Sequence, residues 1–257
     1  MFDQFSHSMK TRSAALLLTI DNRLDRILKA WLVVAGILSA ARVMLSPHPA
    51  GMPSLSTYVS YALLVFAPVV STLLALYWFR DGHRQAQPVT RLAQFGQWRT
   101  IDRTEAERQA LYGAGGIMVS LLVGMMLNVP VRALEYLAAM PPIASNAPAW
   151  LSTLHFAMTF DVVLFGSLYM IAFVAALRRV PLFPRLLVAI WIGDLAMQLF
   201  TAELVTRAGD LPPAVATALH TLLDGHVKKT LISVGLWLPY LLVSKRVNIT
   251  YRSRLPI

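Results

Sequence analysis

Cysteine is absent from this chain of 257 residues. Its absence excludes disulfides, thiolate metal ligands and cysteine nucleophiles. Charged side chains are also scarce, at 14% of the residues, whereas hydrophobic residues make up 56%. Soluble domains carry about 25% charged residues, so the composition indicates a membrane protein.

The apolar residues are gathered in six long stretches, separated by short and weakly polar sequence. The stretches cover residues 30–46, 57–79, 113–131, 153–177, 186–205 and 219–243. Most of them reach the ~20 residues that an α-helix needs to cross a bilayer. The sequence therefore predicts an all-α, polytopic membrane protein with six transmembrane helices.

Positive charge is unevenly shared between alternate loops. If each stretch crosses the membrane once, successive loops lie on alternate sides. One side then receives all but five of the 23 Lys and Arg residues. Because basic loops resist translocation, we expect the richer side, and both termini with it, to be cytoplasmic. The net charge of +10 then reflects loops that face an anionic leaflet. We expect membrane lipid, and no nucleic acid, as a partner.

Two basic segments flank the first two stretches. Residues 1–29 place Leu17, Ile20 and Leu24 on one helical face and charged residues opposite, which predicts an amphipathic helix at the inner surface. This helix either lies on the lipid or packs on the bundle. In the longest loop, residues 104–107 fit a capping box and predict a helix that continues into the third crossing.

Three motifs in the second half of the chain carry a family resemblance. They are YGAGG at residues 112–116, LFPRL at 182–186 and LWLPYLL at 236–242, the last followed by SKRV at 244–247. Together they resemble the YdgK-like family of uncharacterised bacterial inner-membrane proteins, over residues ~112–254. The chain departs from the family at Ile117, where the family tends to have Trp. The resemblance implies a bacterial inner-membrane protein with a four-helix domain over 112–257, preceded by a two-helix extension with a basic loop (30–111), and no established activity.

Two acids lie deep inside predicted crossings. Asp161 and Asp194 are each about eight residues, or ~12 Å, from a helix end. A carboxylate at that depth costs ~2.5–3.5 kcal/mol on insertion scales, so it normally faces the bundle interior and has a partner. Two interpretations are open: an acid that handles a proton or cation, and a purely structural pair. We predict that Asp161 approaches Lys228 or Lys229 of the sixth helix.

The sixth stretch carries five ionisable residues at helical spacing: His220, Asp224, His226, Lys228 and Lys229. Its strictly apolar part, 230–243, would span only ~21 Å, less than the ~30 Å of a bilayer core. We therefore expect its outer half to line a polar recess on the periplasmic side, with Arg42 and Arg132 near the same level. The spacing matches no recognised metal-ligand pattern, so we predict no metal site.

Small residues recur every fourth position at the start of the third crossing. Gly116, Ser120 and Gly124 would allow a second helix to approach closely. We expect this face to serve helix packing.

The sequence contains no nucleotide, metal or nucleophile motif. We therefore expect neither a cofactor nor catalytic activity, with a membrane-embedded enzyme as the third alternative. The leading hypothesis is an accessory or assembly subunit that binds a protein partner within the membrane. The competing hypothesis is a small carrier of an anionic or amphiphilic solute that uses the polar recess and the buried acids.

Overall fold

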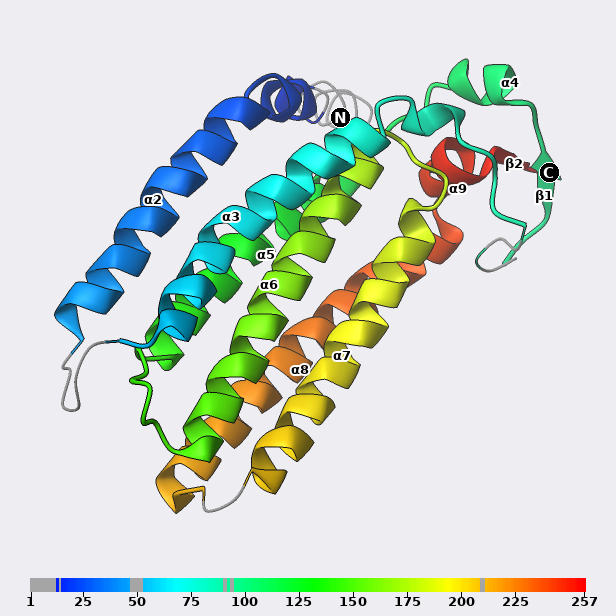
Figure 1. Ribbon diagram of the computed structural model, residues 1–257. Coiled ribbons are helices and arrows are strands. Elements are labelled where there is room, and N and C mark those ends of the chain that lie inside the picture. Colours follow the sequence, from blue (N-terminus) through cyan, green and yellow to red (C-terminus); the bar gives the residue numbers. More distant parts are fainter. Residues whose placement is uncertain (1–12, 14, 47–52, 90–91, 93–94, 209–210) are drawn as a thin grey trace, which may run out of the picture.

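Five helices are long and apolar enough to cross a membrane. The computed structural model describes residues 13, 15–46, 53–89, 92, 95–208 and 211–257. Within these, the five are α2 (Leu24–Leu45), α3 (Leu55–Trp78), α5 (Met118–Ala139), α6 (Ala149–Leu177) and α7 (Phe183–Arg207) (Figure 1). A further helix, α8 (Pro213–Val243), meets the criterion only together with α9 (Lys245–Arg252), from which it is bent by 70°. The expected helical membrane fold is confirmed, with five or six crossings.

The helix starts follow local sequence signals. Ser54 caps α3, because its hydroxyl accepts a hydrogen bond from the backbone N–H of Thr57. Proline occupies the first turn of α7 and of α8, where a missing N–H leaves no bond unmade. These signals separate the apolar sequence into distinct helices.

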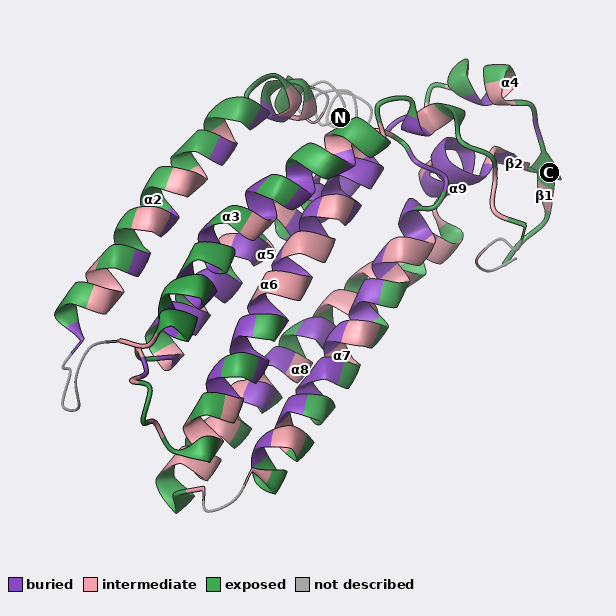
Figure 2. Cartoon of the chain, in the orientation of Figure 1, coloured by how far each residue is buried: buried purple, intermediate pink, exposed green. Residues whose placement is uncertain are grey.

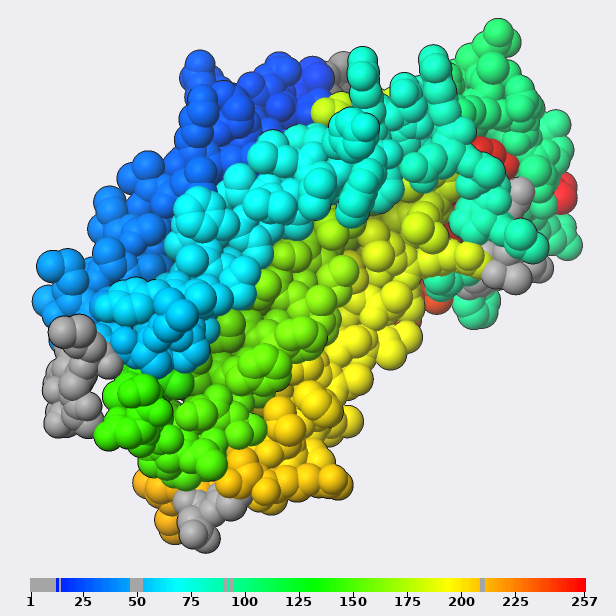
Figure 3. All heavy atoms as spheres, viewed as in Figure 1, coloured from blue at the N-terminus to red at the C-terminus, as the bar shows by residue number. Residues whose placement is uncertain are grey.

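Helix α6 is the centre of the bundle. It packs along α3, α5 and α7, while α8 packs along α7. Figure 3 shows α3, α6 and α7 side by side on one face of the molecule. In the most apolar window of α6, 61% of residues are buried, against 17% in α2 at the edge (Figure 2). The Leu, Val and Ile side chains that α2 and α3 expose are what a lipid-facing surface requires.

The smaller elements gather at one end of the bundle. They are the 3₁₀ turn η1 (Gly82–Arg84), α4 (Arg103–Glu107), α9 and the antiparallel pair β1 (Trp98–Thr100) and β2 (Arg254–Pro256). Ser13 lies at the same end, where its hydroxyl accepts a hydrogen bond from the N–H of Gly116 at 2.9 Å. The first described residue and the carboxyl terminus therefore share this end (Figure 1).

Two expectations about these end segments have different outcomes. Residues 15–22 are helical, and Ile20 and Leu24 are buried on the expected face, while residues 1–12 and 14 lie outside the described residues. The expected helix from 104 into the third crossing is wrong, since α4 ends at Glu107. Gly113 and Gly116 have φ of 101° and 68°, which are not helical, so the backbone leaves the helical conformation before α5 begins.

Candidate functional site: a buried ionic centre

Arg132 of α5 connects three helices through its guanidinium group. Its Nη1 lies 2.9 Å from Oδ2 of Asp161 on α6. Its Nη2 contacts Oδ2 of Asp194 on α7. The three side chains are 8%, 5% and 0% exposed, respectively. We call these three residues the ionic centre.

Neutral side chains also donate hydrogen bonds to the two carboxylates. Gln198 Nε2 donates to Oδ1 of Asp161 at 3.0 Å and to Oδ1 of Asp194 at 3.4 Å. The hydroxyls of Tyr169 and Thr230 each donate to Oδ2 of Asp194 at 3.2 Å. With Arg132 included, four groups donate to Asp194 and two to Asp161. Asp161 is therefore the acid with more acceptor capacity left.

The guanidinium also has partners besides the two acids. Arg132 Nε donates to Oδ1 of Asn128 at 2.9 Å, one turn earlier on α5. Its Cζ lies 5.3 Å from the ring centroid of Phe165 and 5.8 Å from that of Tyr169, both within cation–π range. The aromatic rings and the amide fix the orientation of the guanidinium, so that it faces both carboxylates at once.

The formal charges of the ionic centre do not cancel. Two carboxylates face one guanidinium, which gives a net charge of −1 when both acids are ionised. A net charge buried among transmembrane helices is costly, whereas binding one proton or one monovalent cation would make the centre neutral. The arrangement is thus chemically suited to bind and release a single positive charge.

A second polar layer joins α5 to α8 beside the ionic centre. Glu135 Oε2 lies 3.1 Å from Nε2 of His226, and Glu135 Oε1 contacts Nζ of Lys229. The side-chain exposure rises along this layer, from 8% for His226 to 30% for Glu135 and 56% for Lys229. We call these three residues the α5–α8 seam.

A cavity of about 40 Å³ lies between the seam and the ionic centre. On the side of the ionic centre it is lined by Arg132 and by Tyr169 and Thr230, which bond to Asp194. On the other side it is lined by Glu135, His226 and Lys229 of the seam. This volume is sufficient for a water molecule, and the walls offer several polar partners. Polar groups therefore run from the buried acids to the half-exposed Lys229.

The pairing expected for Asp161 is wrong. Its cationic partner is Arg132, while Lys229 pairs with Glu135 and Lys228 pairs with Asp224 at 2.6 Å on the surface. The run of apolar residues stops at 131, but α5 continues to Ala139, so Arg132 lies within the helix rather than at its outer end. An arginine seven residues from the end of α5 reaches acids near the middle of α6 and α7.

The expected recess along α8 is only partly present. His226, Lys229 and Thr230 line the cavity, whereas His220, Asp224 and Lys228 are exposed on another face of the helix. Arg42 does not belong to the cavity either. Its guanidinium donates to the backbone carbonyls of Ala138 and Met140, at 3.4 Å each, and so caps the carboxyl end of α5.

The small-residue face of the third crossing does not pack within the chain. Gly116 precedes α5, and a Cβ added there would lie 3.5 Å from the guanidinium of Arg246. Ser120 and Gly124 are exposed, and a Cβ at Gly124 would meet no atom within 4 Å. No helix of the described part of the chain makes a close contact here, because α5 turns Leu121, Leu122 and Met125 toward the core instead.

Sequence reasoning missed several hydrogen-bond partners in the site, Gln198 and Tyr169 among them. Gln198 lies four residues after Asp194, and Tyr169 lies eight after Asp161, so each lies on the same side of its helix as one of the two acids. Polar residues at these spacings from a buried acid are the signal that would have identified them.

The fold and the site define a class of protein: a helical, multi-pass membrane protein with a buried ionic centre. Comparison with protein-family models, with curated proteins and with solved structures finds no match.

Proposed function

We propose that this chain is a small inner-membrane carrier in which a proton bound at Asp161 is coupled to the passage of an anionic solute. The observation that carries the proposal is the charge of the ionic centre, where two buried carboxylates share one guanidinium. Asp161 is the proposed proton site because it receives two hydrogen-bond donors, whereas Asp194 receives four.

The α5–α8 seam supports the same proposal. α8 packs mainly along α7, and its link to α5 includes the charged contacts of Glu135 with His226 and Lys229. Such contacts can be exchanged for water when the helices separate, unlike closely packed apolar side chains. In this proposal the opening of the seam admits the solute, and Arg132 provides its cationic contact once Asp161 is protonated.

Proton flux into liposomes tests this function. Proteoliposomes that contain a pH-sensitive dye receive an inward proton gradient together with chloride, phosphate or succinate. We expect anion-dependent acidification of the lumen that Asp161→Asn abolishes. Asp224→Asn is the matched control, because its pair with Lys228 is exposed and lies outside the centre. Acidification no faster than in empty liposomes with every anion, or equal rates in Asp161→Asn and the control, would refute the carrier.

The accessory-subunit hypothesis has a different observation in its favour. Ser120 and Gly124 leave open space on the surface of α5, and α2 buries few of its residues within the chain. Both features would suit contact with helices of another protein. Purification from native membranes in mild detergent distinguishes the two functions, since a stoichiometric protein partner supports the accessory role and a protein that purifies alone supports the carrier.

The proposed sidedness places both termini in the cytoplasm of a bacterium, and it rests on the distribution of Lys and Arg. The absence of cysteine allows a direct test with single-cysteine variants. A membrane-impermeant maleimide added to intact cells should label Asn146→Cys, between α5 and α6, and should leave Gln85→Cys unlabelled until the cells are opened. The reverse pattern would contradict the sidedness.

A further inference from the structure

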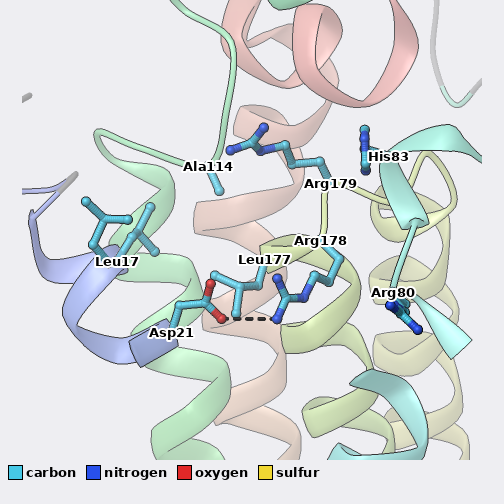
Figure 4. Close-up of a pocket in the computed structure, with 9 residues that line it drawn as sticks. Leu17, Asp21, Arg80, His83, Ala114, Leu177, Arg178 and Arg179 are labelled. Carbon is cyan, nitrogen blue, oxygen red and sulfur yellow. Dashed lines mark hydrogen bonds and ion pairs between the residues drawn. The ribbon is translucent and has the colours of Figure 1, made fainter. Parts of the chain in front are cut away.

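A basic pocket of about 280 Å³ lies at the end of the bundle where the small elements gather. Arg80 and His83 line it from the segment after α3, and Arg178 and Arg179 from the turn after α6 (Figure 4). Asp21 is the one acid that lines it among the residues that the structure describes, and the Asp21 carboxylate pairs with Arg178 at 3.3 Å. Among the described residues, three arginines and one acid thus line the pocket, which leaves an excess of positive charge.

The other basic groups in the pocket pair with no acid of the described chain. Arg179 lies over the ring of Tyr112, with 5.2 Å between Cζ and the ring centroid. The side chains of Arg80 and His83 have no hydrogen-bond or ion-pair partner among the described residues. An anion that entered the pocket would meet donors that no carboxylate already occupies.

The backbone around the pocket is shaped to bring these side chains together. A Cβ at Gly82 would lie 2.5 Å from Cγ2 of Val180, so only glycine lets the turn after α3 lie this close to residues 178–180. Arg179 itself has a φ of 56°, and the N–H of Val180 donates to the carbonyl of Ala175 at 2.9 Å. This is the helix-ending position at which glycine is usual. An arginine there is unfavourable for the backbone, which indicates that its side chain is used.

The remaining walls of the pocket are apolar. Leu17 and Leu18 from the amino-terminal helix and Leu177 from α6 line it. Tyr77 and Trp78, just before Arg80, are exposed at the end of α3, as expected for aromatic residues at the level of lipid headgroups. Basic groups beside apolar walls at this level match a phosphate group that is attached to acyl chains.

We propose that this pocket binds the phosphate of an anionic phospholipid. Arg80 and Arg179 provide the main ionic contacts, and the leucines contact the start of the acyl chains. Free phosphate shares the headgroup chemistry, but it would make no use of the apolar walls. The proposal stands apart from the carrier function, because none of the residues of the pocket belongs to the ionic centre or to the α5–α8 seam.

Native mass spectrometry of the full-length protein tests the site with two variants and one control. The probes are phosphatidylglycerol, phosphatidylcholine and inorganic phosphate. We expect wild type to retain phosphatidylglycerol in preference to the other two. Arg80→Gln and Arg179→Gly should each weaken that binding about fivefold, the effect of one basic residue near a lipid surface. Arg84→Gln is the matched control, since Arg84 lies in the same segment after α3 as Arg80 but does not line the pocket, and it should bind as wild type does.

Arg179→Gly separates binding from folding. Glycine relieves the left-handed backbone at this position, so the melting temperature should be unchanged or higher while phosphatidylglycerol binding falls. Equal binding of the two lipids, or undiminished phosphatidylglycerol binding in both variants, would overturn the proposal. Inorganic phosphate that displaces phosphatidylglycerol at equal concentration would overturn the assignment to a lipid and show a site for free phosphate.

Discussion

The guanidinium of Arg132 lies 2.9 Å from the carboxylate of Asp161, measured from Nη1 to Oδ2, and this ion pair ties α5 to α6 inside the bundle. The same guanidinium contacts Asp194 of α7. One cation therefore pairs with acids from two helices at once. The stability of the bundle should depend on it more than on any surface ion pair.

Arg132→Met removes the cation and leaves two buried carboxylates without it. Breaking a buried pair by deleting one partner costs about 3–5 kcal/mol. We expect a large drop in the melting temperature in mild detergent. Arg207→Met is the control, because the Arg207–Glu203 pair is exposed and such pairs contribute about 0–1 kcal/mol. Equal melting temperatures for the two variants would contradict this assignment.

Arg252 of α9 provides the opposite case, a buried arginine that pairs with no acid in the described part of the chain. Its Nη1 donates to Oδ1 of Asn248 at 3.0 Å, and its Nη2 has no partner among the described residues. Burial, together with the charge of nearby Arg254, lowers the pKa of Arg252 to about 10. Arg252→Met replaces an incompletely paired charge by an apolar side chain of similar length. We expect thermal unfolding at an equal or higher temperature, and a marked decrease would show that Arg252 has a stabilising partner.

The two acids of the ionic centre should respond differently to neutral substitution. Asp161→Asn leaves Arg132 and Asp194 as a neutral pair, so we expect it to cost less stability than Asp194→Asn does. Asp194→Asn weakens the bonds from Arg132, Tyr169 and Thr230 together, and each hydrogen bond to a charged group is worth about 1.5–3 kcal/mol. Melting temperatures measured side by side decide the order. A larger loss for Asp161→Asn would remove the basis for placing the proton there.

The sequence predicted the helical segments and the burial of the two acids, but not their partner. Asp161 and Asp194 were placed correctly because their depth depends only on counting residues along an apolar run. The choice of Lys228 or Lys229 failed because the apolar run that ends at 131 does not mark the end of α5, which continues to Ala139. Helix ends depend on tertiary packing and capping as well as hydropathy, and Arg42 caps α5 from a distant part of the sequence.

Opening of the α5–α8 seam can be detected by labelling in the natural cysteine-free background. Glu135→Gln replaces the carboxylate that binds Lys229 and His226, so water should enter the cavity more often. We expect Ser233→Cys, which lines the cavity, to react several-fold faster with a polar maleimide when Glu135→Gln is also present. Asp224→Asn should leave the rate unchanged. Equal rates in all three backgrounds would show that the Glu135 contacts do not close the seam.

Infrared difference spectroscopy tests the central claim, that Asp161 binds the single positive charge that neutralises the ionic centre. The spectra are recorded in lipid nanodiscs as the pH is lowered across the range in which the protein stays folded. We expect a protonated-carboxyl stretching band that is lost in Asp161→Asn and kept in Asp224→Asn. A band that persists in Asp161→Asn, or that is lost equally in Asp224→Asn, would contradict the account.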